Sequence, residues 1–471
     1  MVFILTVVVL QSISFTNYAL TTTTTNIIYG SAPYLTFDGG RTRVITNSEA
    51  SEALLRISLS DGRTFTPTTN DSSLDNPIEL PVAGQSFNDI GMLIPTDTNS
   101  IALSSVIGPP NNYWGDDDGD GQGVSGVTAT GSLNLVIQDK FNHRVVARNE
   151  VLTICGAPYK LNLSNTYGTL TTRYGVPNES RFNPGYAAYY INPKETTPKI
   201  CYAEPSYPPG EGTSNTVWER FRGFLPQSVT PSSYGLNFPT TGANNLYFDL
   251  RIGGVSQALS WAPVSHGGIT ATMTDSPGHH YNNYYSVRVT LTGPFATYSQ
   301  CQSNNPGRID RPSLPQVFEL VGRDSSGNAV VKYGFELKQW FVGCNFSTVS
   351  IASSWCNSFG YRRPKVSDLT NATCQGEGSN ADCQGAVGAT PSSPDNRVRR
   401  HIGAGFFTEW GSMSNYRGSA FGSREAEYWT SEQKSDNNKY FLVRSTNGGI
   451  LTYSDEQEHW DWPGEVVCVY P

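Results

Sequence analysis

Residues 347–369 read STVSIASSWCNSFGYRRPKVSDL, and this stretch decides how the last third of the chain folds. Its apolar side chains recur three or four positions apart, as on one face of a helix, at Val349, Ala352, Trp355 and Phe359. Gly360 stands where a left-handed residue is needed to cap a helix. The stretch therefore predicts a helix that ends at Gly360 and carries Cys356.

Short patterns of strand and turn residues follow this helix, at residues 406–413, 428–431, 447–449 and 466–469. Asn447-Gly448-Gly449 is typical of a hairpin turn, and the run VVCV at 466–469 is typical of a strand. A cysteine in the first helix and another in this last strand, Cys468, can close such a module end to end. The order and residue types resemble the C-type-lectin-like distal domain of the invasin and intimin adhesins. The resemblance implies a module that binds a partner and rarely performs catalysis.

The chain has eight cysteines, an even number, and none falls in CxxC spacing, which disfavours zinc sites and dithiol redox chemistry. Disulfides in an exported protein are the simplest account, although sequence alone leaves the connectivity open. We expect Cys356–Cys468 across the C-type-lectin-like module and Cys374–Cys383 within its loop. Neighbourhood along the chain favours Cys155–Cys201 and Cys301–Cys344. Each closed loop would stabilise the protein by about 3–4 kcal/mol.

The first residues predict export. Residues 2–10 (VFILTVVVL) are apolar, and a stretch of smaller residues ends near Ala19. The apolar run is too short to span a bilayer, so a secretory signal peptide is expected, although the usual Lys or Arg near the start is missing. The alternatives are an edge strand or a misassigned start. Residues 1–24 are taken as signal peptide and leader, which includes most of the threonine run at 21–25.

Length and composition indicate a mainly β protein of several domains. The chain has 471 residues, which suggests about three domains. Glycine (46) and proline (29) are plentiful, as in short strands joined by tight turns. The net charge is -8 with only 32 Lys and Arg, and no basic tract is present, so nucleic acid is not an expected partner.

Several segments alternate apolar and polar residues, which is the pattern of half-buried strands. They include Leu55, Ile57 and Leu59 before Asp61-Gly62, the set Leu133, Leu135 and Ile137, and the set Val287, Val289 and Leu291. Antiparallel sandwiches are the expected result. We predict a first Ig-like β region at 25–203, then a Pro/Gly-rich linker at 204–214 and a second Ig-like sandwich up to 329. A C-type-lectin-like α+β domain follows at 330–471.

An acidic loop is the sharpest polar motif. Residues 114–123 read WGDDDGDGQG, in which Asp116, Asp118 and Asp120 alternate before Gly121. Carboxylates alternating on a tight loop can converge on one point, and Ca²⁺ prefers such hard oxygen ligands. The EF-hand pattern is incomplete, because Val127 stands where a bidentate glutamate would be. The alternative is a solvated acidic turn.

Two tryptophans that flank an acid are the candidate binding residues. Residues 455–463 read DEQEHWDWP, a stretch expected to be a loop before the last strand. Trp460 and Trp462 could anchor a partner, since aromatic side chains dominate interface hot spots, and Asp461 could meet a basic surface. The alternative is that one tryptophan fills the core of the module. Trp410 and Trp429 are expected to be core residues.

Two other polar clusters carry weaker expectations. Arg397, Arg399, Arg400 and His401 follow a Pro394-Asp395 turn and would form a solvated helix start or contact an acidic partner. His279-His280, with Tyr281, Tyr284 and Tyr285, could form a metal or ligand patch, but an exposed polar loop is expected because no third metal ligand is evident. No GxSxG, HExxH or P-loop pattern is present, and paired cysteines leave no nucleophilic thiol, so no enzyme is predicted.

The chain from residue 28 onward resembles a family of enterobacterial exported adhesin-like proteins associated with intimin-type outer-membrane translocators. The motifs that carry this resemblance are IYGSAPYLTFDGG at 28–40, WGDDDGDG at 114–121, YYINPK at 189–194, NFPTTGANNLYFDL at 237–250, FELVGRD at 318–324 and YGFELKQWFV at 333–342. The resemblance implies Ig-like domains, a lectin-like tip and a separate translocator. It supplies no binding residues. The Glu-Pro-Asn or Gln-Pro-Asp and Trp-Asn-Asp triads of calcium-dependent sugar lectins are missing, and Ser393-Pro394-Asp395 is a poor substitute.

The expectation is therefore a non-enzymatic, exported, adhesin-like protein at the bacterial surface or outside the cell. Its C-terminal module would bind a host or bacterial surface protein. The alternatives are a secreted virulence-modulating exoprotein and a carbohydrate-binding lectin. Calcium is the only cofactor considered.

Overall fold

The computed structural model describes residues 29–44, 46–119, 126–140, 146–194, 197–206, 210–255, 257–276, 285–344, 349–421, 426–435, 439–453 and 464–471. The chain divides into two compact units. Residues up to 81, 85–151 and 159–191 belong to the first unit, and residues 82–84, 152–158 and 192–471 belong to the second. The predicted signal peptide and leader lie outside the described residues. No helix in the described part of the chain is long and apolar enough to cross a membrane.

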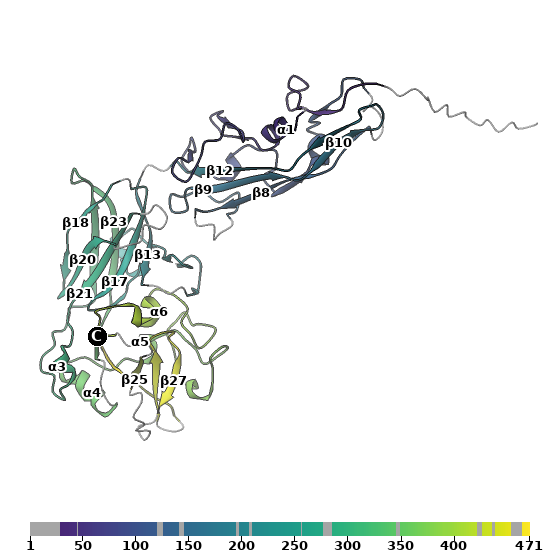
Figure 1. Ribbon diagram of the computed structural model, residues 1–471. Helices are drawn as coiled ribbons and strands as arrows, with labels where there is room; N and C mark the ends of the chain where they lie inside the picture. The colour runs from purple at the N-terminus through teal and green to yellow at the C-terminus, as the bar shows by residue number, and fades with distance from the viewer. Residues whose placement is uncertain are drawn as a thin grey trace, which may run out of the picture. The chain divides into compact units, whose positions relative to one another are not determined.

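The first unit is built on a sheet with the strand order β4-β12-β9-β8-β5 (Figure 1). The strands are β4 (Ile78–Glu79), β5 (Ser100–Ala102), β8 (Ser132–Gln138), β9 (Tyr159–Asn165) and β12 (Gly185–Asn192). The central strands pair antiparallel, with Leu163 of β9 opposite Leu135 of β8 and Ala187 of β12. The predicted set Leu133, Leu135 and Ile137 is buried, which confirms the alternation.

A smaller sheet of this unit has the order β11-β10-β7. Its strands are β7 (Val127–Ala129), β10 (Gly168–Thr172) and β11 (Glu179–Phe182). Leu170 and Phe182 are buried in this sheet, as Leu161 and Tyr189 are in the larger one. Each sheet therefore has one buried and one wetter side, as in an antiparallel sandwich. The remaining elements are β1 (Tyr34–Leu35), β6 (Trp114–Gly115), η1 (Phe87–Asp89) and α2 (Leu103–Ile107).

The first predicted strand is shorter than its pattern suggests. Helix α1 (Asn47–Leu54) ends directly before it, so Leu55 caps this helix, and only β2 (Ile57–Ser58) is extended. β2 pairs with β3 (Thr64–Phe65), which confirms the hairpin predicted from Asp61-Gly62. The helix begins with a capping box, in which Thr46 and Glu49 each accept a hydrogen bond from the other's backbone N–H.

The second unit begins with another sandwich. One sheet has the order β14-β15-β13-β17-β21-β20-β19, and the other has the order β18-β22-β23. The strands are β13 (Lys199–Pro205), β14 (Trp218–Glu219), β15 (Gly223–Phe224), β17 (Leu246–Gly253), β18 (Ser260–Trp261), β19 (Val264–His266), β20 (Ile269–Asp275), β21 (Tyr285–Thr292), β22 (Gln316–Arg323) and β23 (Ala329–Leu337). Val287, Val289 and Leu291 are buried, as predicted. Strands β13 and β23 run across the predicted limits at 203 and 329, and the domain limits themselves stay predictions.

An α+β module follows and shares a sheet with the sandwich. β24 (Gln339–Cys344) pairs parallel with β16 (Thr241–Ala243), which comes from the sandwich region, and antiparallel with β28 (Val466–Tyr470). A second sheet contains β25 (Glu427–Gln433), β26 (Tyr440–Arg444) and β27 (Ile450–Tyr453). The helices of the sandwich region are η2 (Pro231–Leu236) and α3 (Tyr298–Cys301), and those of the module are α4 (Val349–Ser358), α5 (Val366–Leu369), η3 (Ala381–Cys383), α6 (Phe406–Trp410) and η4 (Met413–Asn415).

The stretch that opened the sequence analysis folds as predicted. α4 ends at Ser358, Gly360 has a φ of 81°, and Trp355 and Phe359 are buried. The turn at Asn447-Gly448-Gly449 joins β26 to β27. The four disulfides are Cys155–Cys201, Cys301–Cys344, Cys356–Cys468 and Cys374–Cys383, the expected pairs. The fold class is therefore confirmed as mainly β, with tandem Ig-like sandwiches before a C-type-lectin-like module.

Candidate binding surface of the C-terminal module

The candidate binding residues Trp460, Asp461 and Trp462 lie outside the described residues, as does the loop with His279 and His280. Their proposed role as partner anchors therefore stays a prediction. Trp410 and Trp429, which were expected to be core residues, are buried. Trp410 Nε1 donates to the backbone oxygen of Thr241 at 3.0 Å, and Trp429 Nε1 donates to that of Gly464 at 3.0 Å.

Two carboxylates of the acidic loop, Asp117 and Asp118, bond to other residues of the first unit. Asp117 accepts a hydrogen bond from the Tyr34 hydroxyl at 3.0 Å and forms an ion pair with Arg43. Asp118 accepts from the backbone N–H of Ser31 at 2.7 Å. Bonds of this kind offset the mutual repulsion of the carboxylates in a solvated acidic turn.

The calcium proposal rests on three carboxylates of this loop. Asp120 lies outside the described residues, so the convergence of Asp116, Asp118 and Asp120 stays a prediction. Among the residues that the structure describes, no group of three His, Cys, Asp or Glu side chains is placed to hold a metal ion. Calorimetric titration of Ca²⁺ into the full chain tests the loop, and no heat at millimolar Ca²⁺ would dispose of the proposal.

A buried glutamate joins the module to the sandwich before it. Glu409 of α6 is fully buried, and its carboxylate accepts hydrogen bonds from the backbone N–H and hydroxyl groups of Thr240 and Thr241. The N–H of Gly403 donates a further bond at 2.8 Å. Burial raises the pKa of Glu409, and these hydrogen bonds oppose the shift. The carboxylate thus ties α6 to the strand β16.

A buried arginine lies beside this contact. Arg400 Nη1 donates to the backbone oxygen of Glu409 at 3.0 Å, and its guanidinium carbon lies 5.1 Å from the centroid of the Trp218 ring. Gly411 has a φ of 77°, and a Cβ there would lie only 2.0 Å from Arg400 Nη2. Burial lowers the pKa of Arg400 to about 10, so the guanidinium stays charged at neutral pH.

The segment at 210–213, part of the expected linker, lies against the last module. The backbone N–H of Thr213 donates to Arg400 O at 3.1 Å, and the N–H of Arg400 donates to Glu211 O at 2.9 Å. Trp218 Nε1 donates to Gly210 O at 2.7 Å. Backbone pairing and a tryptophan therefore hold this segment in place.

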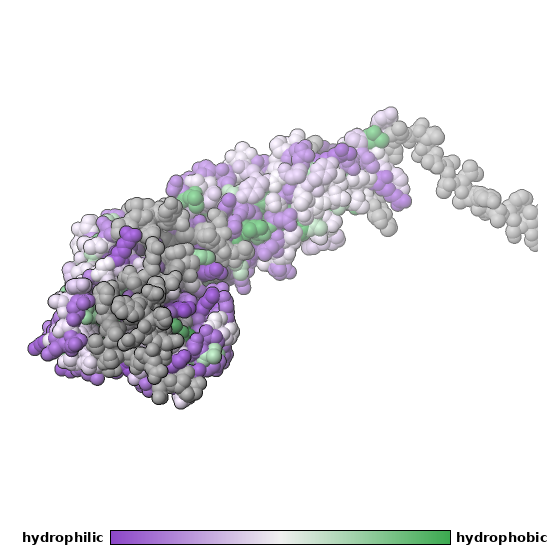
Figure 2. All heavy atoms as spheres, turned by 60° about the horizontal axis from the view of Figure 1, so that its bottom comes forward, coloured by the Kyte–Doolittle hydropathy of each residue, from purple (hydrophilic) through white to green (hydrophobic). Residues whose placement is uncertain are grey.

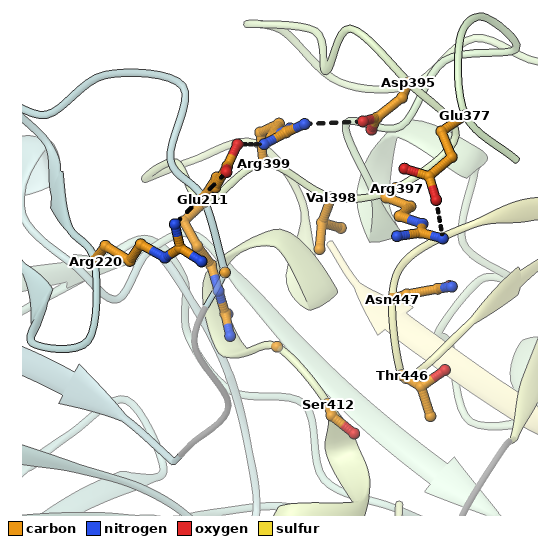
Figure 3. Close-up of a pocket in the computed structure, with 13 residues that line it drawn as sticks. Glu211, Arg220, Glu377, Asp395, Arg397, Val398, Arg399, Ser412, Thr446 and Asn447 are labelled. Atoms are coloured by element: carbon orange, nitrogen blue, oxygen red, sulfur yellow. Dashed lines mark hydrogen bonds and ion pairs between the residues drawn. The ribbon is translucent and has the colours of Figure 1, made fainter.

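A pocket of about 360 Å³ opens where these pieces meet (Figure 3). It is lined by Gly210, Glu211, Arg220, Glu377, Asp395, Arg397, Val398, Arg399, Arg400, Gly411, Ser412, Thr446 and Asn447. We call it the arginine pocket. Its residues come from the start of the sandwich and from four separate segments of the last module, so the pocket exists only when the two pack together.

Ion pairs run along the wall of the arginine pocket (Figure 3). Arg399 lies 2.9 Å from Asp395 and also pairs with Glu211, which lies 3.9 Å from Arg220. Arg397 pairs with Glu377 at 2.7 Å. Burial lowers the pKa of Arg399, but its bonds to Asp395 and Glu211 outweigh burial and raise the pKa above its ordinary value.

The sequence pointed to part of this site. Arg397, Arg399 and Arg400 were predicted to start a solvated helix or to contact an acidic partner. The prediction of a solvated helix start is wrong, because residues 394–401 are not helical and Arg400 is buried. Glu211, Arg220 and Glu377 were not foreseen, because they are distant in sequence and only tertiary packing brings them to the pocket.

Comparisons with known proteins include a weak sequence match to an adhesin. No family model matches the chain. The chain is 24% identical over 196 residues to the inverse autotransporter adhesin YeeJ of Escherichia coli K12. The match covers 39% of this chain and 7% of that protein, so the chain spans a small part of its relative's length. The match supports the resemblance to intimin- and invasin-type adhesins.

Two crystal structures of intimin are also similar, at low TM-scores. The EHEC O157:H7 intimin mutant has a TM-score of 0.29 and 12% identity, over 58% of this chain and 98% of that one. The C-terminal 282-residue fragment of intimin, in complex with the intimin-binding domain of the translocated intimin receptor, has a TM-score of 0.32 and 11% identity. It covers 73% of this chain and 93% of that one.

Proposed function

We propose that the chain is an exported, non-enzymatic adhesin-like protein that binds a host or bacterial surface protein through its C-terminal module. The observation that carries the proposal is the sequence match to an inverse autotransporter adhesin. A separate intimin-type outer-membrane translocator would carry the chain to the bacterial surface. The sandwiches would hold the module, and Trp460, Asp461 and Trp462 would contribute to its partner surface.

The four disulfides support the exported location. All eight cysteines are paired, and disulfides persist in the oxidising compartments outside the cytosol. The longest loop, between Cys356 and Cys468, closes the module end to end with a sequence separation of 112. A module stapled in this way keeps its shape outside the cell, where a surface ligand must act.

The packing of the second unit supports presentation of the module in one orientation. β16 of the sandwich region pairs with β24 of the module, and Glu409 and Trp410 of α6 both bond to the segment Thr240-Thr241. Removing one partner of a buried, hydrogen-bonded charge costs about 3–5 kcal/mol. The sandwich therefore serves as a rigid base for the binding surface.

The described residues on the face drawn in Figure 2 are mostly hydrophilic or intermediate in hydropathy. Figure 2 shows hydrophobic residues as small separate groups among hydrophilic and intermediate ones. A surface of this kind favours a partner contact built on a few aromatic and charged anchors over a broad apolar interface. Protein partners that carry matching charges fit this description.

The test is saturable binding of the labelled full chain to host epithelial cells and to bacteria. The cells are compared after surface proteolysis, after glycosidase treatment and in EDTA. Loss of binding after proteolysis, with binding retained after glycosidase and in EDTA, is the expected result. Loss after glycosidase alone would favour the carbohydrate-binding lectin. Absence of saturable binding to any cells would contradict the proposal and favour a secreted exoprotein.

A further inference from the structure

The arginine pocket concentrates positive charge on an acidic protein. The whole chain carries 32 Lys and Arg against 40 Asp and Glu. The pocket reverses this balance, with Arg220, Arg397, Arg399 and Arg400 against Glu211, Glu377 and Asp395. All four cations are arginines, whose planar guanidinium binds a carboxylate through two parallel hydrogen bonds, which a lysine cannot do.

Two of the arginines are held firmly by the fold. Arg400 is buried against Trp218. Arg399 is 23% exposed and is fixed by Asp395, which is only 12% exposed. These two guanidinium groups form a preorganised wall, because neither needs to be ordered when a ligand arrives.

The two other arginines have exposed partners that a ligand can replace. Arg397 is 51% exposed and pairs with Glu377, which is 67% exposed, and Arg220 lies 3.9 Å from the exposed Glu211. Exposed pairs of this kind contribute only about 0–1 kcal/mol. A carboxylate from outside can therefore displace Glu377 from Arg397, or pair with the loosely held Arg220, at little cost.

An exposed aromatic residue, Phe221, adjoins Arg220, which lines the pocket. Phe221 follows Arg220 in the turn between β14 and β15, and the Arg220 guanidinium carbon lies 4.9 Å from the centroid of its ring. Phe221 is 48% exposed and has a φ of 70°, which is an outlier for a bulky side chain. Such strain costs about 1–3 kcal/mol and clusters at binding sites. Arginine and aromatic residues side by side are also typical of interface hot spots.

We propose that the arginine pocket receives an acidic side chain of the partner protein, with Arg220 and Arg397 as its bidentate donors. Phe221 contacts an apolar residue next to that acid. The partner motif is thus an exposed segment in which Asp or Glu adjoins an aromatic or aliphatic residue. This inference rests on the proposed function, which it deepens by naming the chemistry of the partner surface.

The first test uses two fluorescein-labelled octapeptides, identical in their Gly, Ser and Trp residues, one with four Asp and the other with four Asn. Fluorescence anisotropy with the full chain should show saturable binding of the Asp peptide and none of the Asn peptide. The double variant R220E/R397E should weaken Asp-peptide binding at least tenfold. The matched control R308E/R323E makes the same charge change at two exposed arginines outside the pocket and should bind like the wild type.

Three results would overturn the inference: no saturable binding of the Asp peptide, equal binding of both peptides, or equal loss in both double variants. Cell binding separates this inference from the proposed function. If R220E/R397E binds cells as well as the wild type does, the role of the arginine pocket is contradicted and the adhesin proposal stands. If the wild type does not bind cells, the adhesin proposal is contradicted. The two peptides then still test whether the arginine pocket binds acidic side chains.

Discussion

At the residue scale, the buried charged side chains stabilise the fold, whereas the exposed ones can exchange their ion-pair partners for a ligand. Glu409 and Arg400 are both buried. Glu409 accepts hydrogen bonds from Thr240 and Thr241 across the contact with the sandwich, and Arg400 donates to a backbone oxygen within the module. Arg220 and Arg397 lie in the same region but are more than half exposed. Burial, more than residue type, separates the arginines that hold the fold from those that can bind a ligand.

Replacing Glu409 with alanine leaves several buried N–H and hydroxyl donors without an acceptor. Each unsatisfied buried donor costs about 1–3 kcal/mol, so E409A should lower the free energy of unfolding by about 3 kcal/mol or more. Urea unfolding of the full chain, followed by tryptophan fluorescence, measures the change. The control D310N removes an exposed carboxylate and should stay within about 0.5 kcal/mol of the wild type. An E409A curve that overlays the control would show that the carboxylate does not tie α6 to the sandwich.

Phe221 offers a test that separates function from stability. Asparagine tolerates positive φ better than phenylalanine, so F221N should keep or slightly raise the free energy of unfolding. Its binding to the acidic peptide and to cells should weaken several-fold, because the aromatic contact is lost. Thermal unfolding and anisotropy on the same sample measure both quantities. A variant that unfolds at lower temperature, yet binds normally, would place Phe221 among the structural residues.

At the element scale, most strands and the helix α4 (Val349–Ser358) could be predicted from side-chain periodicity, because alternation and helical spacing report burial directly. The helix α1 (Asn47–Leu54) was missed, although its capping box is visible at Thr46 and Glu49. Strands of two or three residues, such as β16 (Thr241–Ala243), are too short to show a period. Only part of the arginine pocket could be predicted from the sequence, because the packing of the sandwich against the module brings Arg220 and Arg397 to the same pocket.

The disulfides should differ in their effect on stability. In the chain-entropy model, a loop of about 100 residues stabilises by about 4.7 kcal/mol and a loop of about 15 residues by about 3 kcal/mol. The separations are 112 for Cys356–Cys468 and 9 for Cys374–Cys383, so C356A/C468A should destabilise more than C374A/C383A. Urea unfolding under non-reducing conditions compares the two. The reverse order would mean that native packing dominates over loop closure.

The loss of stability at acid pH should include a contribution from the protonation of Asp368 in α5. Burial raises its pKa, but hydrogen bonds from Arg362, Gln339 and the N–H of Lys365 outweigh burial and lower the pKa below its ordinary value. A depressed pKa means that the stabilisation is present above the unfolded pKa of about 3.9 and is lost as the pH falls through the lower folded value. The difference between wild type and D368N should therefore stay constant from about pH 8 to 5 and shrink below about pH 4. A difference that grows with acid would contradict this assignment.

At the scale of the whole molecule, the second unit presents a surface that neither of its parts has alone. The sandwich supplies Glu211 and Arg220, and the last module supplies Arg397, Arg399 and the loop with Asn447. The first unit is a separate β-sandwich, and its acidic loop is internally bonded. This division places the proposed binding activity in the second unit, which the Cys356–Cys468 disulfide and the buried Glu409 keep in one shape.

The central claim is that the C-terminal module contacts a protein on a cell surface. Cross-linking mass spectrometry of the full chain, bound to the cells that it recognises, tests this claim most directly. Cross-links to surface proteins should come mainly from residues 339–471 and the adjoining turn with Arg220, and they should disappear when the cells are treated with protease beforehand. Cross-links confined to the first unit, or to glycans only, would contradict the account.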